Sequence, residues 1–340
     1  MKTLRRLILL ALGLTFVVVV LGAYVRLSDA GLGCPDWPGC YGQLTPAHAA
    51  DEIRAAESAQ PGGPVSLPKA WKEMVHRYLA ASLGLLILAI AALSWRHRRT
   101  AGSAPGVALA LVGVVIFQGL LGKWTVTLLL KPAIVTGHLL GGMATLALLG
   151  WLALRAYRVA SRPSPAGLVA AARLGLVLVV AQIALGGWTS TNYAALACQD
   201  FPTCHGEWMP AADFANAFHV VRELGMDANG ELLTSEALTA IHWTHRLGAL
   251  LLAGYLLVLA ILMVRHAGLR PLSALLLAAL GGQLALGIAN VWMSLPLPLA
   301  VAHNGGAAVL LLALVRINHG LTRVRVLRPM EENRNANAYA

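Results

Sequence analysis

The chain has 340 residues, of which 58% are hydrophobic and only 12% are charged, and its mean hydropathy is +0.68. Because soluble globular proteins carry roughly 25% charged residues, these values exclude a soluble enzyme, a disordered chain and a coiled coil. They predict an all-α polytopic membrane protein. The net charge of +11 would suit a nucleic-acid-binding protein, but membrane proteins also gather Lys and Arg in their cytoplasmic loops.

Eight apolar stretches of about 18 residues or more predict eight transmembrane helices. They cover about 7–27, 74–95, 105–129, 133–154, 167–189, 238–264, 271–294 and 298–316. The first follows MKTLRR, as in a signal peptide, but its apolar run is long for one and no A-x-A site follows directly. Two longer segments, about 28–73 and 190–237, are predicted to be outer loops of a length that is usually functional.

The charged residues divide between the two ends of the predicted helices. Basic residues cluster around 2–6, 96–99, 155–162, 265–270 and 316–328. Of the 15 acidic residues, all but Glu331 and Glu332 fall at the other end. The positive-inside rule therefore predicts that both termini are cytoplasmic, with a cytoplasmic tail over 321–340. Topology explains the basic excess, and no nucleic-acid partner is expected.

The two halves of the sequence, 1–160 and 161–320, are predicted to be copies. LGAYVRLSDAGLGCPDWPGCYG in the first half matches LGGWTSTNYAALACQDFPTCHG in the second, and Gln118, Gly122 and His138 match Gln283, Gly287 and His303. Each half has an even number of spans, so both enter the membrane in the same orientation. This predicts two four-helix bundles related by a pseudo-twofold axis along the membrane normal. Such bundles build cofactor sites between facing helices.

Five of the eleven histidines lie at the outer ends of the even-numbered predicted helices. They are His76, His138, His242, His245 and His303. An ionisable residue inside a span is a candidate functional residue. All but His242 occupy repeated positions, so each bundle offers two histidines at equal depth, which suits bis-histidine ligation of a haem. A zinc site at His242 and His245 is the competing prediction, although no cysteine or carboxylate is placed to complete it.

Small residues and arginines accompany the histidines. Gly141, Gly248 and Gly306 follow a histidine by three residues. They are expected to leave room for a flat macrocycle, and close helix packing is the alternative. Arg77 and Arg246 directly follow His76 and His245 and are expected to pair with haem propionates or to anchor the helix at the interface.

The cysteines occur as C-x5-C in both outer loops, on the oxidising side of the membrane, where disulfides persist. The short spacing predicts the disulfides Cys34–Cys40 and Cys198–Cys204. A structural staple and a redox-active pair both remain open.

Glu73 breaks the symmetry between the halves. It lies three residues before His76, where the second half has His242 before His245. A carboxylate one turn from a haem ligand can manage protons there, so the first half is expected to react and the second to carry electrons. The alternative is a carboxylate that is favoured by the dipole at a helix N-terminus.

Together, the E-x-x-H-R motif, the duplicated histidines and the paired cysteines resemble haem A synthase over roughly 7–316, in particular the bacterial members with cysteines in two outer loops. That family oxidises the C8 methyl of haem O to a formyl group and so makes haem A for terminal oxidases. The resemblance implies that His245 and His303 hold haem b. It also implies that His76, His138 and the catalytic Glu73 receive haem O, with His242 as an accessory residue.

The resemblance further implies a place in the bacterial cytoplasmic membrane with the haem sites near the outer face. It implies a haem O synthase partner and a membrane electron donor, and it leaves the oligomeric state open, a homo-oligomer included. Three other functions remain: a di-haem b electron-transfer protein, which would not need Glu73; a quinone-linked thiol oxidase, which needs no buried histidines; and a transporter, which would share the repeat.

Overall fold

The computed structural model describes residues 1–323. Eight long helices are each long and apolar enough to cross a membrane. They are α1 (Lys2–Leu27), α3 (Leu67–Arg96), α4 (Pro105–Thr127), α5 (Pro132–Ala156), α6 (Ala166–Thr191), α8 (Ser235–Val264), α9 (Arg270–Trp292) and α10 (Leu297–Gly320). The eight predicted spans and the all-α membrane fold are thereby confirmed. Arg325, Arg328, Glu331 and Glu332, with most of the predicted tail 321–340, lie outside the described residues.

Short elements connect the long helices. They are α2 (Ala50–Ala59), β1 (Arg162–Ser164), η1 (Ala194–Leu196), α7 (Phe214–Ala217), η2 (Ala267–Leu269) and β2 (Leu321–Arg323). The strands β1 and β2 pair in parallel, with Arg162 opposite Leu321. This pairing ties the segment that joins the two halves of the chain to the segment that follows α10.

The structure corrects the predicted start of α3. The helix begins at Leu67, with Pro68 in its first turn, where proline costs no hydrogen bond because the first N–H groups of a helix have no intrahelical partner. The apolar stretch alone does not indicate that the helix begins at Leu67, because Lys69 and Lys72 interrupt it. Glu73 therefore lies inside the helix, one turn before His76, rather than in the outer loop.

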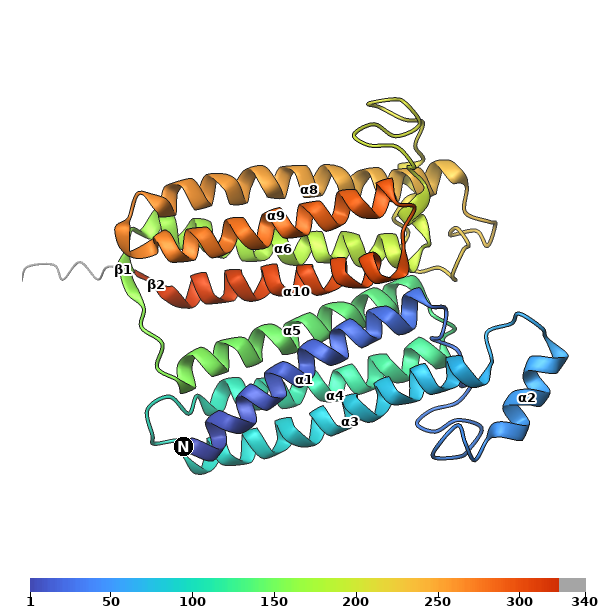
Figure 1. Cartoon of the computed structure of the whole chain (residues 1–340), viewed down its shortest axis with the longest axis horizontal. Helices are drawn as coiled ribbons and strands as arrows, with labels where there is room; N and C mark the ends of the chain where they lie inside the picture. Colours follow the sequence, from blue (N-terminus) through green and yellow to red (C-terminus); the bar gives the residue numbers. More distant parts are fainter. Residues whose placement is uncertain (324–340) are drawn as a thin grey trace, which may run out of the picture.

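The long helices pack as two sets of four. In the first set, α1 and α4 each contact both α3 and α5; in the second, α6 and α9 each contact both α8 and α10. The sets meet where α5 contacts α6 and α10 and where α1 contacts α10, and they lie side by side (Figure 1). The pseudo-twofold relation between the sets stays a prediction.

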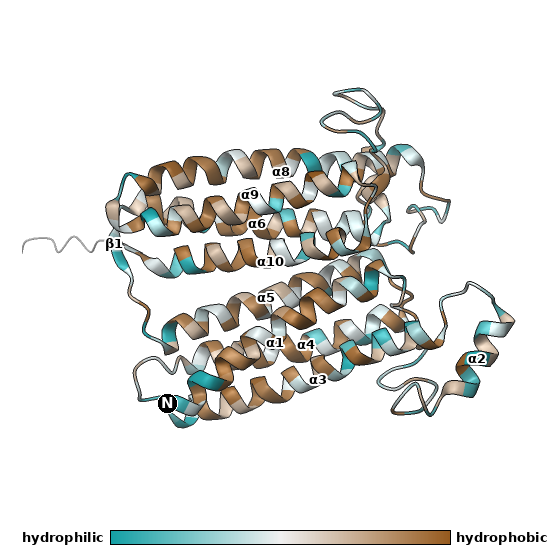
Figure 2. Ribbon diagram, viewed as in Figure 1, coloured by the Kyte–Doolittle hydropathy of each residue, from teal (hydrophilic) through white to brown (hydrophobic). Residues whose placement is uncertain are grey.

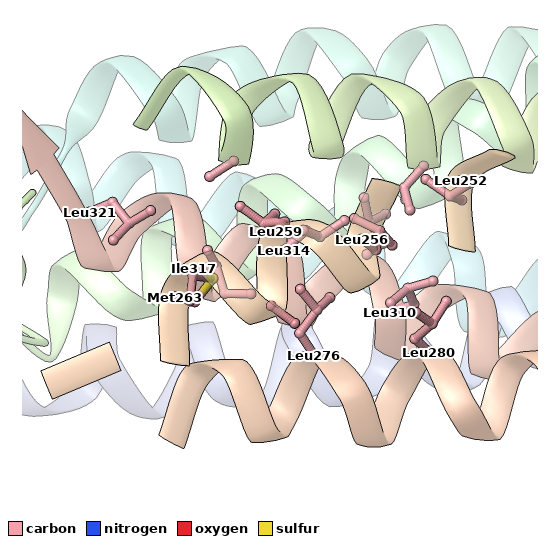
Figure 3. Close-up of a cluster of buried hydrophobic side chains, with 14 of the residues drawn as sticks. Leu252, Leu256, Leu259, Met263, Leu276, Leu280, Leu310, Leu314, Ile317 and Leu321 are labelled. Atoms are coloured by element: carbon pink, nitrogen blue, oxygen red, sulfur yellow. The ribbon is translucent and has the colours of Figure 1, made fainter. Parts of the chain in front are cut away.

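Leucines and other apolar residues fill the middle of both sets, as the hydropathy colouring shows (Figure 2). In the second set Leu256, Leu314 and Ile317 are fully buried against Leu276 and Met263 (Figure 3). Lipid tails are as apolar as leucine, so the stabilisation comes from close packing of these side chains rather than from transfer out of water.

The two ends of the helix sets differ in chemistry. One end, called the loop end, carries the segments 28–66 and 192–234, which contain all four cysteines. The opposite end, called the basic end, carries the N-terminus and the β1–β2 pair (Figure 1). The candidate site lies toward the loop end.

Candidate functional site at the paired histidines

His76 of α3 and His138 of α5 face each other in the first helix set. Their ring centroids lie 6.5 Å apart and their planes are nearly perpendicular, at 82°. Imidazole nitrogens bind a metal at roughly 2.0–2.1 Å, so two rings on opposite sides of one metal have centroids about 6.3 Å apart. The observed spacing therefore fits two axial ligands of one haem iron.

Each of the four paired histidines lies against a glycine of a neighbouring helix. A methyl group added at Gly22 would lie 3.0 Å from Cε1 of His76, and one added at Gly186 would lie 3.1 Å from Cε1 of His245. The other two pairs are Gly122 with His138, at 3.4 Å, and Gly287 with His303, at 3.1 Å. At Gly22, Gly186 and Gly287 a larger residue would crowd the ring, whereas the contact at Gly122 is an ordinary van der Waals distance.

Three of the four paired histidines have a buried ring nitrogen without a partner within residues 1–323. Nδ1 of His76, His138 and His303 is buried and has no hydrogen-bond partner among the described residues. Buried polar atoms are normally hydrogen-bonded, so three orphaned imidazole nitrogens at repeated positions mark a site rather than ordinary packing. The spacing of His76 and His138 fits a haem in the first half, and His245 and His303 stand at the matching positions of the second half.

The glycines that follow the histidines have a different role from the one expected. A methyl group at Gly141 would lie 2.3 Å from Oε1 of Gln118, and one at Gly248 would lie 2.4 Å from Oε1 of Gln182. Gly306 faces Gln283 in the same way. The space beside these glycines holds glutamine side chains, so the expectation that it holds a macrocycle is wrong.

These glutamines support the helices that carry the histidines. Nε2 of Gln118 donates to the carbonyl of His138 at 2.9 Å, and Nε2 of Gln182 donates to the carbonyl of His245, also at 2.9 Å. Gln182 also lies 2.9 Å from Nδ1 of His245. Its repeat position in the first half is Val18, so His76 lacks this contact.

Glu73 and His242 occupy the same place in the two halves. Oε2 of Glu73 accepts from the amide of Cys34 at 3.0 Å, and Oε1 accepts from Arg77. The imidazole of His242 lies 3.2 Å from the amide of Cys198 and 3.2 Å from Nε of Arg246. In each half, the side chain one turn before the paired histidine therefore faces the first loop cysteine and the arginine.

His242 is thus not positioned as a ligand. Both of its nitrogens face N–H donors, although a neutral imidazole can accept at only one nitrogen. Among residues 1–323 no three His, Cys, Asp or Glu side chains gather as a metal site. This geometry does not support the zinc site. It leaves His245 as the histidine of α8 that belongs to the histidine pair.

The two arginines that follow the histidines contact the cysteine loops. Nη1 of Arg77 donates to the carbonyls of Asp36 at 2.9 Å and of Gly39 at 2.6 Å. Nη1 of Arg246 donates to the carbonyls of Asp200 at 2.7 Å and of Thr203 at 2.8 Å. Both guanidinium groups therefore bind the cysteine loops to the helices, and pairing with haem propionates stays a prediction.

Both predicted disulfides are present, Cys34–Cys40 and Cys198–Cys204. All four cysteines are fully buried. Labile disulfides are usually strained or exposed, so burial favours the structural staple over the redox-active pair. With the arginines, the disulfides fix the loops from which the cysteine amides reach Glu73 and His242.

Asp200 closes the second cysteine loop. Its carboxylate accepts from the Thr203 hydroxyl at 2.5 Å and from the amides of Gly206 at 2.9 Å and His205 at 2.7 Å. These hydrogen bonds, that from Thr203 first, hold the pKa of Asp200 well below its usual value. Asp36 binds the amides of Tyr41 and Gly42 in the same way.

A pH dependence of this loop follows from the lowered pKa of Asp200. A carboxyl group with a depressed pKa stabilises the folded loop above its unfolded pKa, and this contribution is lost only as the pH falls through the folded pKa. The amides of His205 and Gly206 should therefore stay protected from hydrogen exchange, corrected for intrinsic rates, from about pH 7 down to about pH 4. In Asp200→Asn they should exchange faster throughout; loss of protection in the parent near pH 5 would contradict this.

Sequence reasoning found the histidines, Glu73 and the cysteines but missed the role of Gly22, Gly186 and Gln182. Gly22 and Gly186 stand at matching positions of the repeat, in LGAY and LGGW. That match was a usable signal. For Gln182, a polar residue within an apolar span was the only signal.

Comparisons with known proteins agree with these features. A family model described as cytochrome oxidase assembly protein, COX15-CtaA, matches residues 5–315. A curated protein of Shewanella oneidensis named heme A synthase is 46% identical over 90% of this chain and 93% of its own. Proteins of the same name from Halalkalibacterium halodurans and Paracoccus denitrificans are 28% and 29% identical, over 68% and 89% of this chain and 72% and 83% of their own.

Proposed function

Because the chain belongs to the COX15-CtaA family of cytochrome oxidase assembly proteins, we propose that it is a haem A synthase, an oxidoreductase that converts the C8 methyl of haem O to a formyl group within the membrane. The observation that carries the proposal is the asymmetric duplication of the site. Histidines stand at matching repeat positions in both halves, but among the described residues only His76 and His138 have a buried carboxylate, Glu73, one turn before the first of them.

The first half, 1–160, is proposed as the substrate half. His76 and His138 bind the iron of haem O, and their centroid spacing of 6.5 Å supports this assignment. Gly22 and Gly122 keep the neighbouring helices clear of the rings. The substrate is then held between fixed side chains rather than on mobile loops.

Glu73 is proposed as the catalytic acid–base group. Oxidation of a methyl group to a formyl group releases protons, and a water molecule must leave before the aldehyde forms. The Glu73 carboxylate can take up a proton at Oε2 and give it back, while the Cys34 amide and Arg77 keep it oriented. A positioned acid or base typically contributes about 10²–10⁴-fold to rate.

The second half, 161–320, is proposed as the haem b half. His245 and His303 would hold the haem, and Gln182 orients the imidazole of His245, as outer partners of metal ligands commonly do. A bound haem b would supply one-electron transfer. His242 replaces the carboxylate in this half, and its contacts with Cys198 and Arg246 maintain the loop rather than move protons.

The partners and orientation are part of the same proposal. A haem O synthase must supply the substrate, and a membrane electron donor or acceptor must complete the redox cycle. The concentration of arginines at the basic end supports cytoplasmic termini, which places the histidine pairs near the outer face of a bacterial cytoplasmic membrane.

A di-haem b electron-transfer protein is the second candidate, because the two histidine pairs are equivalent. Glu73 distinguishes the two functions, since a pure electron carrier has no use for a buried carboxylate beside one pair only. The test is the absorption spectrum and chromatography of haems extracted from protein purified from cells that make haem O. We expect haem b together with haem O or haem A; haem b alone at two per chain would favour the electron carrier.

A steric substitution tests the substrate half. Gly22→Val should displace the His76 ring and abolish most haem O binding, because even its Cβ would lie 3.0 Å from the ring. Gly13→Val in the same helix is the matched control, since nothing lies within 4 Å of a Cβ there. The measurement is haem O bound per chain, with haem b as an internal reference. Equal haem O in the two variants would remove His76 from the substrate site.

A further inference from the structure

A polar pocket lies at the basic end, opposite the end that carries the cysteine loops. It has a volume of about 180 Å³ and is lined by Arg162, Arg316, Pro271 and Leu272 and by the backbone at Gly268 and Gly320. This volume is several times the ~30 Å³ that one water molecule occupies in the liquid. We propose that the pocket binds the phosphate group of an anionic membrane lipid.

The charges in the pocket are uncompensated. Nη1 of Arg316 is buried and has no hydrogen-bond partner among the described residues, and the Arg162 guanidinium lines the same pocket. Buried charges are normally paired, because leaving one unpaired costs free energy. Arg162 is exposed and Arg316 is half-buried, but the buried Nη1 of Arg316 lacks an acceptor, which favours binding of an anion between the two guanidinium groups.

The described chain supplies no such anion at this end. All 13 acidic residues within residues 1–323 belong to the loop end, from Asp29 to Glu236. Two further arginines are close in sequence to the lining residues Gly268 and Pro271: Arg265 before η2 and Arg270 at the start of α9. The counter-charge must come from a ligand or from the tail beyond residue 323.

The backbone is shaped to hold the two arginines. Pairing of β1 with β2 puts Arg162 opposite Leu321, directly after the end of α10. A methyl group at Gly268 would clash with Nη1 of Arg162, and one at Gly320 would lie 2.8 Å from Nη1 of Arg316. Both guanidinium groups thus lie close to backbone at glycines, where a side chain would displace them.

The surroundings favour a lipid over other phosphate compounds. The pocket lies at the ends of membrane-spanning helices, and Pro271 and Leu272 give it an apolar wall beside the two cations. Arginine matches phosphate oxygens with two parallel hydrogen bonds, and basic pockets between transmembrane helices bind anionic headgroups. Free phosphate offers the same oxygen atoms to the arginines but has no acyl chains to contact the apolar wall.

The test uses the full-length protein, delipidated and titrated with phosphatidylglycerol in phosphatidylcholine nanodiscs, with bound lipid counted by native mass spectrometry. The double variant Arg162→Gln/Arg316→Gln should bind phosphatidylglycerol about tenfold more weakly or worse, because charge-assisted hydrogen bonds are lost. Arg6→Gln/Arg99→Gln removes the same charge from exposed positions at the same end and should bind as the parent does. Gly268→Ala keeps every charge but displaces Arg162, and should also weaken binding.

Three outcomes of this experiment would overturn the proposal that the pocket binds lipid. Equal binding by the pocket and control variants would show only general attraction to a basic surface. Binding of inorganic phosphate that displaces the lipid completely at matched ionic strength would assign the pocket to a soluble anion. If the parent binds no lipid but Glu331→Gln/Glu332→Gln does, the chain's own tail carries the counter-charge. Unchanged haem b content in all variants is the control for folding.

Discussion

Glu73→Gln is expected to retain the fold, haem b and haem O binding and yet to form little haem A. Glutamine keeps the size of the side chain and one acceptor for the Cys34 amide or Arg77, but it cannot take up or release a proton. Because a positioned acid or base contributes about 10²–10⁴-fold, the loss should be nearly complete. The measurement is the ratio of haem A to haem O extracted from membranes that contain equal amounts of the two proteins.

His242→Gln is the matched control for this substitution. His242 makes the equivalent contacts with Cys198 and Arg246, so its replacement disturbs the second loop to the same degree without removing a carboxylate. It should leave most haem A formation intact. Haem A production by Glu73→Gln at the parental level would show that the asymmetry between the halves is not the catalytic one.

His245→Ala and His303→Ala are each expected to remove the stable haem b. The two residues are the repeat counterparts of His76 and His138, and each lies against a glycine whose replacement would crowd the ring. Truncation to alanine removes the imidazole that each helix contributes at the repeated position. The measurement is the low-spin haem b absorbance per chain, which should fall to a small fraction of the parental value.

His242→Ala, one turn from His245 on the same helix, is the comparison for that loss. Its nitrogens face the Cys198 amide and Arg246, so haem b should be largely retained. A full haem b spectrum in both His245→Ala and His303→Ala, or its loss only in His242→Ala, would require another pair of ligands.

The features that the sequence predicts well are those that depend on local pattern or on the repeat. Length and apolarity determine the eight helices, and the short C-x5-C spacing determines the disulfides. The duplication singles out His138 and His303 from the other histidines, because a coincidence of polar residues at matched positions is informative even without any contact being known.

The features that the sequence does not predict depend on contacts between distant segments. Gly22 meets His76 across two helices, and Arg77 meets carbonyls some forty residues earlier. Every residue has a backbone carbonyl, so the sequence does not indicate which carbonyls an arginine will bind. The position of Arg77 next to His76 therefore suggests a propionate as its partner. Gly141 likewise makes room for Gln118 of another helix, which only the packing can reveal.

The most direct test of haem A synthesis is conversion itself. The chain would be expressed with a haem O synthase in a bacterial host that makes haem O but no haem A, and the membrane haems would be extracted and separated by chromatography. Haem A should appear with the parent chain and be nearly absent with Glu73→Gln, while haem b stays bound to both. If the parent chain is present with its haem b and the host still accumulates haem O without any haem A, the chain does not catalyse this oxidation.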